Sequence, residues 1–394
     1  MPSKNSYSIL LHYSEIALKL NNRKYFESIF INNIISHIQG LEYSEVKLIS
    51  ARVFIHNIDF NQWNEYKNRL KKLMGLQHAT LVIKTSNDLN DISSSAKQLI
   101  ENQDFNSFRI TTKRNNKKFK YNSNEVNIKV GEDVRKISKK LVKLNNPDLN
   151  IIIEILASNT YVGYDRVNGF SGLPAGSQEK AISLISSGID SPVSSFEMIK
   201  RGIRLDYIHF HSYPAINKQS IDNVKKLLEI LTKYQLKSTL YLVPLLDIQQ
   251  KIMELIPDKY WVIFFRRFMI HIANIIGLKN KSVALVTGDS VGQVASQTLS
   301  NIRAISDVST LPILRPLAGM NKENIVNRAK EINTYEISIL PYEDCCSFFV
   351  PPHPETKAKI EQIDRLDSKL DLTDLVNKAV KDTEKINMNF GDSL

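Results

Sequence analysis

The chain has 394 residues, of which 42% are hydrophobic and 24% charged, a composition typical of a soluble protein with two or three domains and a substantial core. Its only cysteines, Cys345 and Cys346, exclude a disulfide framework, a four-cysteine zinc site and an iron–sulfur cluster held by three cysteines of this chain. No N-terminal segment resembles a signal peptide and the most apolar segment carries Arg266 and Arg267, so we expect a cytoplasmic location and no membrane span.

The first part of the chain alternates between strand-like and helix-like patterns. We expect a strand at 8–13, a helix at 23–38, a hairpin of strands 46–49 and 52–56, a helix at 61–74 and a strand at 79–83. This β-α-β-β-α-β order is typical of a ferredoxin-like fold. A second α+β unit follows, with a helix at 91–100, a strand at 107–112, a helix at 130–144 and strands at 150–156 and 160–165.

Positive charge is concentrated in this N-terminal part. Residues 1–178 carry 25 Lys and Arg against 16 Asp and Glu, whereas the remaining residues carry 27 against 25. Two dense runs hold Lys113, Arg114, Lys117, Lys118 and Lys120, and then Arg135, Lys136, Lys139, Lys140 and Lys143. The second run has the spacing of one helical face. A solvated face is the plain alternative, but two such runs in an otherwise nearly neutral chain favour an RNA phosphate-binding surface.

The second half of the chain follows a linker that glycine and proline mark at residues 167–178. Alternating strands and helices predict a parallel, doubly wound α/β sheet, with a polar helical tail after about residue 366. We expect domains at 1–60, 61–166 and 179–394. Open parallel sheets bind ligands where their strands end, and three apolar strands here run into polar loops at 186–191, 209–212 and 287–298.

The first of these loops is the most informative. An apolar strand at 181–185 runs into Ser-Ser-Gly-Ile-Asp-Ser, and an amphipathic helix follows at 193–202. A strand, a turn of small residues and a helix N-terminus can present backbone N–H groups to a phosphate, although an ordinary turn is the plain alternative. Asp190 indicates a magnesium ion or a role in the chemistry. The chain has no Walker A loop, and this segment resembles the PP-loop of enzymes that cleave ATP between the α and β phosphates, with Ser187 in place of that motif's first glycine.

Further motifs in the same order resemble one family. Residues 287–298 read Thr-Gly-Asp-Ser-Val-Gly-Gln-Val-Ala-Ser-Gln-Thr, residues 172–176 read Gly-Leu-Pro-Ala-Gly, and residues 13–19 read Tyr-Ser-Glu-Ile-Ala-Leu-Lys. Together with the PP-loop they resemble the ThiI family of tRNA 4-thiouridine synthetases, or tRNA sulfurtransferases. Residues 109–164 are similar to that family's THUMP RNA-binding domain. Ser14, Leu20 and Ser187 stand where the family usually has glycine.

The resemblance implies an ATP pyrophosphatase domain whose site residues match positions in this sequence. Adenine and ribose would contact Leu184, Ile185, His209 and Phe210. Further ATP contacts would come from Arg266, Gly288 and Gln297. The pyrophosphate cradle would comprise Ser186, Gly188, Asp190 and Ser191. Arg266 as a surface arginine and Gly288 as a turn glycine are the plain alternatives. His209 and His211 could be taken for a metal pair, but we expect no metal held by them.

The two adjacent cysteines follow an acidic stretch and precede a proline-rich loop. Free cysteines are usually buried small hydrophobic residues. In the ThiI family a cysteine in this region takes part in sulfur transfer, and many members carry a rhodanese domain that these 394 residues lack. The resemblance therefore implies that Cys345 or Cys346 receives the sulfur, or that a separate donor delivers it. The implied partners are tRNA, a cysteine desulfurase or other persulfide donor and a sulfur-carrier protein, and a homodimer is usual in the family.

The implied reaction uses ATP and Mg²⁺ to adenylate the uridine at tRNA position 8, and persulfide sulfur then replaces the C4 oxygen to give 4-thiouridine. Sulfur supply for the thiazole of thiamine is implied as well. Two other classes stay open, a non-catalytic THUMP-type RNA-binding protein with a degenerate PP-loop and another PP-loop enzyme that modifies RNA. Release of pyrophosphate from ATP in the presence of tRNA would separate the enzyme from the binding protein.

Overall fold

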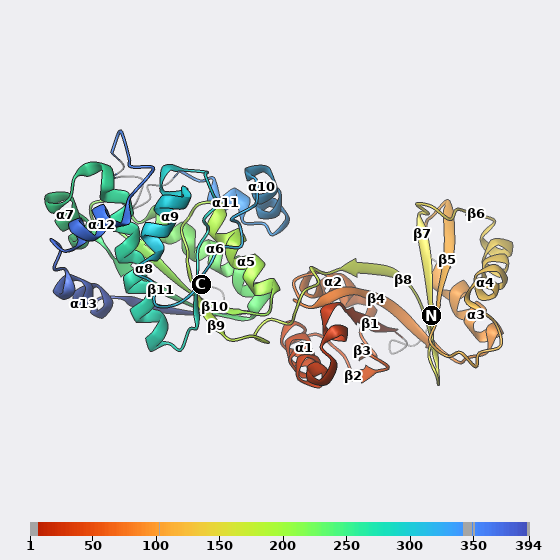
Figure 1. Cartoon of the computed structure of the whole chain (residues 1–394). Helices are drawn as coiled ribbons and strands as arrows, with labels where there is room; N and C mark the ends of the chain where they lie inside the picture. The colour runs from red at the N-terminus through yellow and green to blue at the C-terminus, as the bar shows by residue number, and fades with distance from the viewer. Residues whose placement is uncertain (1–6, 102, 342–348, 350, 392–394) are drawn as a thin grey trace. The chain divides into compact units, whose positions relative to one another are not determined.

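The computed structural model describes residues 7–101, 103–341, 349 and 351–391, and the chain divides into two compact units (Figure 1). The first unit comprises residues 1–173 and the second residues 174–394. Each unit has its own sheet and its own hydrophobic core.

A mixed sheet of eight strands forms the centre of the first unit, in the order β2-β3-β1-β4-β8-β7-β5-β6. The strands are β1 (Tyr7–Tyr13), β2 (Glu45–Ile49), β3 (Arg52–His56), β4 (Leu76–Thr85), β5 (Ser107–Arg114), β6 (Leu141–Val142), β7 (Leu149–Ile155) and β8 (Thr160–Asn168). The helices are α1 (Arg23–His37), α2 (Trp63–Leu70), α3 (Leu89–Ile100) and α4 (Ser123–Ser138). Because β4 pairs with both β1 and β8, the ferredoxin-like part and the second α+β part share one continuous sheet.

The first hydrophobic core of this unit extends further along the chain than expected. It joins Ile9 of β1 and Phe30 of α1 to Tyr66 of α2 and Leu81 of β4. The expected domain boundary between residues 60 and 61 falls inside this core. We therefore propose to place the boundary near residue 85, where β4 ends and the chain enters the core built by α3, α4, β5 and β7.

The helix expected at 130–144 overlaps α4, but α4 begins and ends earlier in the chain. A capping box starts α4 earlier, since the Asn122 side chain accepts from the Glu125 N–H while the Glu125 carboxylate accepts from the Asn122 N–H. The helix ends at Ser138 because Lys139 adopts the left-handed conformation, with φ 56°, and the chain then pairs β6 with β5. The prediction that residues 135–143 share one helical face is therefore wrong, because Lys140 and Lys143 lie beyond the helix.

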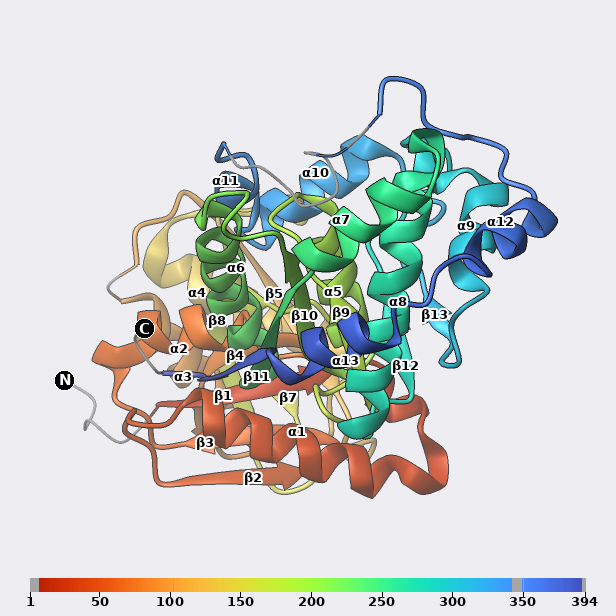
Figure 2. The same cartoon turned by 90° about the vertical axis from the view of Figure 1, so that its left-hand side faces the viewer.

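Six strands form the sheet of the second unit, in the order β13-β12-β9-β10-β11-β14. They are β9 (Lys180–Leu184), β10 (Arg204–His211), β11 (Lys237–Pro244), β12 (Ala284–Val286), β13 (Ile313–Leu314) and β14 (Glu384–Asn389). The first five pair in parallel, and β9, β10 and β11 lie side by side at the centre (Figure 2). This confirms the predicted doubly wound parallel sheet.

Helices cover both faces of this second sheet. They are α5 (Asp190–Lys200), α6 (Gln219–Gln235), α7 (Leu246–Leu255), α8 (Trp261–Lys279), α9 (Leu299–Ser306), α10 (Lys322–Glu331), α11 (Tyr335–Ser338), α12 (Ile360–Asp367) and α13 (Thr373–Lys381). One group contains α5 and α6, which pack against each other, and the other contains α8 with α7, α9 and α13. Figure 1 shows the sheet between the two groups.

The helix that contains α8 is apolar enough to be compared with a membrane span. The segment Asp258–Lys279 is long and apolar enough to cross a membrane, by length and composition alone. However, 61% of its apolar 18-residue stretch is buried inside the structure. Phe264 and Phe265 are fully buried in the largest core of the second unit. This burial is what a core helix of a folded domain shows, and it agrees with the expectation drawn from Arg266 and Arg267.

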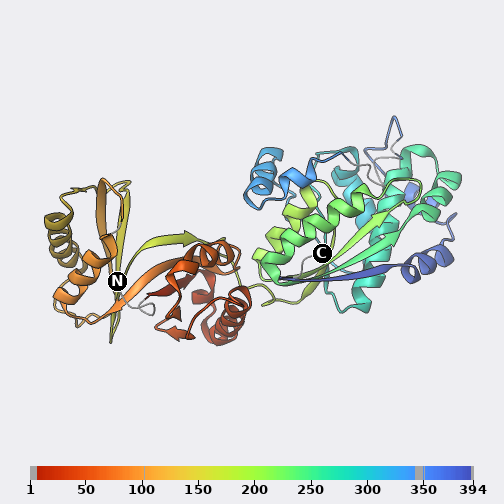
Figure 3. The ribbon, with the colours of Figure 1, turned by 180° about the vertical axis from the view of Figure 1, so that it is seen from behind.

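The end of the described chain is a strand, where a helical tail was expected. After α13 the chain forms β14, which pairs antiparallel with β11 from Lys237 opposite Asn389 to Leu242 opposite Glu384 (Figure 3). Met388 is buried and Ile386 half-buried, whereas Lys385, Asn387 and Asn389 are exposed. This alternation is the strand signal that the sequence analysis missed for this segment.

Candidate functional site

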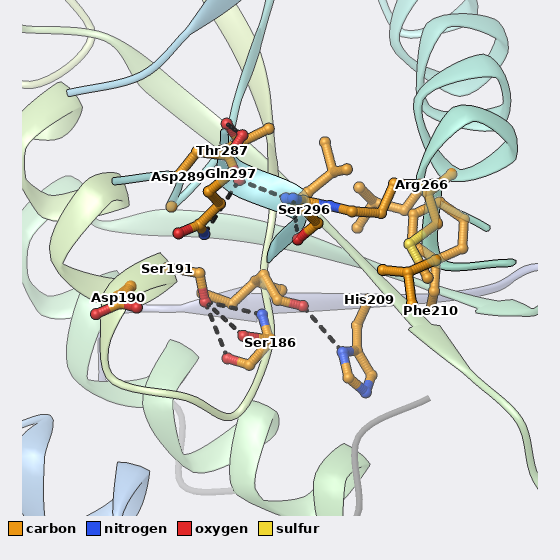
Figure 4. Close-up of a pocket in the computed structure, with 16 residues that line it drawn as sticks. Ser186, Asp190, Ser191, His209, Phe210, Arg266, Thr287, Asp289, Ser296 and Gln297 are labelled. Carbon is orange, nitrogen blue, oxygen red and sulfur yellow. Dashed lines mark hydrogen bonds and ion pairs between the residues drawn. The ribbon is translucent and has the colours of Figure 1, made fainter. Parts of the chain in front are cut away.

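A cavity of about 240 Å³ lies at the carboxyl ends of β9, β10 and β12 (Figure 4). The strand ends and α5 supply Leu184, Ile185, Ser186, Asp190, Ser191, Ile208, His209, Phe210, Thr287, Gly288 and Asp289, α8 supplies Val262, Arg266 and Met269, and the 3-10 turn η5 (Ala295–Gln297) supplies Ser296 and Gln297. The chain runs from β9 to β10 on one side, whereas β12 pairs with β9 on the other. The cavity therefore lies at the topological switch point, where open α/β sheets bind their ligands.

Two serine hydroxyls close the turn between β9 and α5. The Ser186 N–H donates to Ser191 Oγ at 2.8 Å, and Ser191 Oγ donates to the Ser186 carbonyl at 3.1 Å. Ser187 is 1% exposed and is not among the residues with positive φ, so its backbone conformation is open to any residue. The replacement of glycine by Ser187 therefore introduces no backbone strain in the turn.

Gly288 allows the loop after β12 to lie directly against the N-terminus of α5. A Cβ atom at this position would lie 2.9 Å from the backbone N and 3.0 Å from the Cα of Ser191. Both atoms belong to the backbone, so they move only if the start of α5 moves. The φ of Gly288 is not positive. Close approach, and not turn conformation, is therefore the reason for glycine here.

Arg266 and Asp289 form an ion pair in the wall of the cavity (Figure 4). The Arg266 guanidinium also donates to Ser296 Oγ at 3.1 Å, and its side chain is 22% exposed. Asp289 is 3% exposed. Burial by itself would raise the pKa of Asp289, but Arg266, Thr287 and Arg315 outweigh it and hold that pKa at about 2. Arg266 is therefore a fixed part of the wall and not a solvated surface arginine.

Asp190 is the first residue of α5 and lies at the mouth of the cavity. One carboxylate oxygen accepts from Lys322 Nζ at 2.6 Å and the other from Gln293 Nε2 at 2.7 Å. Lys322 starts α10, and its side chain is about half exposed. The sequence analysis missed Lys322, because nothing in the sequence indicates that residues 132 positions apart meet.

The two histidines of β10 have different surroundings. His209 Nδ1 lies 2.9 Å from the Ile185 carbonyl oxygen, which orients its ring in the cavity wall. His211 does not line the cavity, and burial, with His209 and Lys218, lowers its pKa to about 4. Among the described residues no cluster of three or more His, Cys, Asp or Glu side chains could hold a metal ion.

The structure brings most of the predicted site residues together. Every expected nucleotide contact except Gly188 lines the one cavity, and Gly188 lies in the turn beside it, where its carbonyl accepts from Ser338 Oγ at 3.3 Å. The sequence analysis missed Ile208, Val262 and Met269 as lining residues, and it gave Thr287, Asp289 and Ser296 only as part of the expected ligand loop 287–298. Cys345 and Cys346 lie outside the described residues.

The two basic runs of the first unit lie at opposite ends of β5. The first run starts at the carboxyl end of this strand with Lys113. The second run continues past β6, which pairs with Ser107 and Phe108 at the amino end, and the Lys143 N–H donates to the Phe108 carbonyl. At about 3.3 Å per residue the two ends are roughly 23 Å apart. The lysines and arginines of both runs are exposed, except for the half-buried Arg114 and Lys140.

The fold and the cavity define a nucleotide-binding type of α/β domain, joined in one chain to an α+β unit with a basic surface. Three family models match successive parts of the chain: the ThiI ferredoxin-like domain at residues 8–80, the THUMP domain at 86–165 and the thiamine biosynthesis protein (ThiI) at 176–372. With the close relatives below, these matches show that the chain belongs to the ThiI family.

Relatives cover nearly the whole chain. It is 39% identical over 382 residues to a probable tRNA sulfurtransferase of Acetivibrio thermocellus, covering 95% of this chain and 97% of that one. It is 36% identical over 381 residues to a probable tRNA sulfurtransferase of Geobacillus kaustophilus, covering 96% and 95%.

Solved structures also resemble this chain over most of its length. The crystal structure of a 4-thiouridine synthetase–RNA complex with bound ATP has a TM-score of 0.88 at 34% identity, covering 98% of this chain and 100% of that one. A Pyrococcus horikoshii protein, PH1313, shares the fold with a TM-score of 0.65 at 21% identity, covering 83% of this chain and 99% of that one.

Proposed function

We propose that this chain is an ATP-dependent tRNA sulfurtransferase that converts the uridine at tRNA position 8 into 4-thiouridine. The observation that carries the proposal is the cavity at the sheet switch point, bounded by the Ser186–Ser191 turn, in a chain of the ThiI family. A relative that aligns over 95% of this chain is named a probable tRNA sulfurtransferase, and a structural neighbour holds both RNA and ATP.

The lining of the cavity favours one orientation of ATP. Ile185, Phe210 and Met269 give one end an apolar lining suited to adenine. The N-terminus of α5 and the hydroxyls of Ser186 and Ser191 form the other end, where backbone N–H groups and the helix dipole favour phosphate. Arg266 adds a fixed positive charge to the wall. We therefore place the base toward α8 and the phosphates toward α5.

Asp190 is the residue we expect to hold a magnesium ion with the phosphates. Mg²⁺ is usually bound by one or two carboxylates together with substrate phosphates and water, so a single aspartate at the mouth of the cavity is sufficient. The ion would neutralise charge on the pyrophosphate that leaves. To hold the ion, Asp190 would exchange its contact with Lys322, and Lys322 would then be available to the phosphates.

The reaction that these groups support has three steps. The C4 oxygen of the uridine attacks the α-phosphate, which forms an adenylated uridine and releases pyrophosphate. The outer sulfur of a persulfide then bonds to C4, and AMP leaves with the oxygen. A second thiol attacks the S–S bond of the resulting C4–S–S–R group, which frees 4-thiouridine and leaves a disulfide that an external thiol reduces before the next turnover. The turn and α5 stabilise the negative charge that develops on the phosphates in the first step.

The sulfur source and the tRNA surface complete the proposal. Cys345 or Cys346 receives sulfur from a cysteine desulfurase or another persulfide donor, or the donor attacks the adenylate directly. The basic surface of the first unit binds tRNA phosphates. Because tRNA is the substrate, we place the activity in the cytoplasm. The proposal also includes that the chain forms a homodimer and that it supplies sulfur for the thiazole of thiamine.

The test follows pyrophosphate release and 4-thiouridine formation by the purified chain with ATP, Mg²⁺, unmodified tRNA, a cysteine desulfurase, cysteine and a thiol reductant. We expect both products, and both should depend on tRNA and ATP. Tight tRNA binding without pyrophosphate release would instead identify a non-catalytic RNA-binding protein.

A second arm replaces both cysteines with serine. We expect this variant to release pyrophosphate but to form no 4-thiouridine with the desulfurase, and we expect a high concentration of free sulfide to restore part of the product. Full turnover of the variant with the desulfurase would show that the persulfide of the donor attacks the adenylate directly.

A further inference from the structure

Asp289 is a buried carboxylate that gathers donors from four separate segments of the second unit. Its Oδ1 pairs with Arg266 of α8 and lies 3.5 Å from Gln297 Nε2 of η5. Its Oδ2 accepts from Thr287 Oγ1 at 2.8 Å and from Arg315 Nε at 3.1 Å, beyond β13. Each oxygen therefore has two donor groups, which matches the two lone pairs of a carboxylate oxygen.

The partners of Asp289 include groups that line the cavity. Arg266 reaches the cavity from α8, and Gln297 reaches it from η5. Besides their shared contact with Asp289, these two elements are connected by the hydrogen bond from Arg266 to Ser296. Arginine and glutamine side chains have several rotatable bonds, and without a fixed acceptor they would sample many conformations. The contacts drawn in Figure 4 show both side chains turned toward Asp289 on one side of the cavity.

Electrostatics make this arrangement sensitive to the charge on Asp289. The carboxylate is 3% exposed, so it would be costly to bury without its cationic partners, and they in turn are only partly exposed. An asparagine at this position would keep the shape but lose the charge. It would also direct an amide N–H₂ group at side chains that are themselves donors.

We propose that Asp289 is a positioning residue for ATP, acting through Arg266 and through the η5 turn that carries Gln297. This inference rests on the proposed function, because it assumes that the cavity binds ATP. Asp289 does not contact the nucleotide in this account. It fixes the direction of the guanidinium and the position of η5, so that the wall is already arranged when ATP enters.

The experiment compares Asp289→Asn with the wild-type full chain. We expect the Kd for ATP, measured by equilibrium binding, and the KM for ATP in pyrophosphate release to rise tenfold or more. The kcat at saturating ATP should change by less than about threefold, and tRNA affinity should stay the same. An ATP Kd within twofold of the wild-type value would overturn the proposal.

Asp206→Asn is the matched control. Asp206 is also a buried aspartate of this sheet, paired with Lys180 at 2.6 Å, but Lys180 starts β9 at the edge away from the cavity. We expect Asp206→Asn to lower the melting temperature without changing the Kd for ATP. If it weakens ATP binding as much as Asp289→Asn does, the effect of Asp289 is only structural and the proposal is wrong.

Two further variants separate the possible failures. Arg266→Gln should weaken ATP binding, and adding Asp289→Asn to it should raise the Kd by a smaller factor than Asp289→Asn does in the wild-type chain, because only the route through η5 remains. Fully multiplicative effects would contradict a role through Arg266. If Asp289→Asn does not fold, Arg315→Gln tests the same contact from a residue outside the cavity. We expect a two- to fivefold rise in the Kd for ATP, and an unchanged Kd would overturn the proposal. Absence of ATP binding by the wild-type chain would instead reject the proposed function itself.

Discussion

The basic runs of the first unit and the cavity of the second unit carry their charges in opposite ways. In the first, the two basic runs are mostly exposed and lie at two ends of one strand. In the second, the charged groups at the cavity are paired, as Arg266 is with Asp289 and Lys322 with Asp190. A long polyanion can be bound by many weakly oriented cations, whereas one small ligand needs a few groups held in fixed positions. Substitutions should therefore act gradually in the first unit and abruptly in the second.

The largest effect is expected for Asp190→Ala. This change removes the carboxylate at the N-terminus of α5 and leaves Lys322 and Gln293 without their acceptor. We expect 4-thiouridine formation to fall by a factor on the order of 100 or more, as when a group that stabilises developing charge is lost, while tRNA affinity stays within twofold. The two quantities should be measured in parallel. Full activity would remove Asp190 from the mechanism, and an equal loss of tRNA affinity would erase the contrast between the units.

The next effect is expected for Gly288→Ala. The new methyl group would lie 2.9 Å from the backbone of Ser191, so either the loop or the start of α5 must shift, at a cost of roughly 1–3 kcal/mol. We expect the Kd for ATP to rise about tenfold, as measured by equilibrium binding. Gly319→Ala is the matched control, because a Cβ there meets nothing within 4 Å. Equal affinities for ATP in the two variants would show that the close approach at Gly288 is unimportant.

A graded effect is expected when the exposed cations of the first unit are neutralised. Each phosphate contact that is lost should reduce the slope of log affinity against log salt by up to about 1. We expect Lys117→Gln with Lys118→Gln to weaken tRNA binding and lower this slope, and Lys136→Gln with Lys143→Gln to add to the effect. Lys251→Gln, which removes a partly exposed lysine from α7, is the control. An unchanged slope after all four replacements would place the RNA elsewhere.

The smallest effect concerns the pH dependence of stability in the first unit. Burial, followed by Arg166, His12 and Lys113, lowers the pKa of His78 from 6.5 to about 3. Between those two pH values the unfolded chain binds a proton that the folded chain does not, so acidification over this window reduces stability. His78→Asn should therefore show a weaker fall in melting temperature from pH 7 to pH 4.5 than the wild-type chain. The exposed His271→Asn serves as control, and identical pH profiles for wild type and His78→Asn would contradict the prediction.

Local sequence patterns predicted the parts of the site that depend on neighbouring residues. The apolar strand before Ser186 and the glycine at 288 indicated where β9 and β12 end, and chain topology then brought those ends together. Lys322 and Arg315 escaped prediction because each meets its aspartate only through folding, 132 and 26 residues away. Likewise, the spacing of the second basic run is compatible with one helix, and the left-handed conformation of Lys139 has no glycine to indicate it.

The antiparallel strand β14 has a consequence for the order in which the chain can fold. It covers the free edge of β11, although about 140 residues separate the two strands along the chain. An uncovered edge strand exposes unpaired backbone groups and can pair with another molecule. At the usual ribosomal speed of 5–20 residues per second, β11 waits roughly 7–30 s after its synthesis for its partner. During that interval the edge of β11 lacks the strand that covers it in the folded chain, so a sheet formed this early has an edge open to pairing with another molecule.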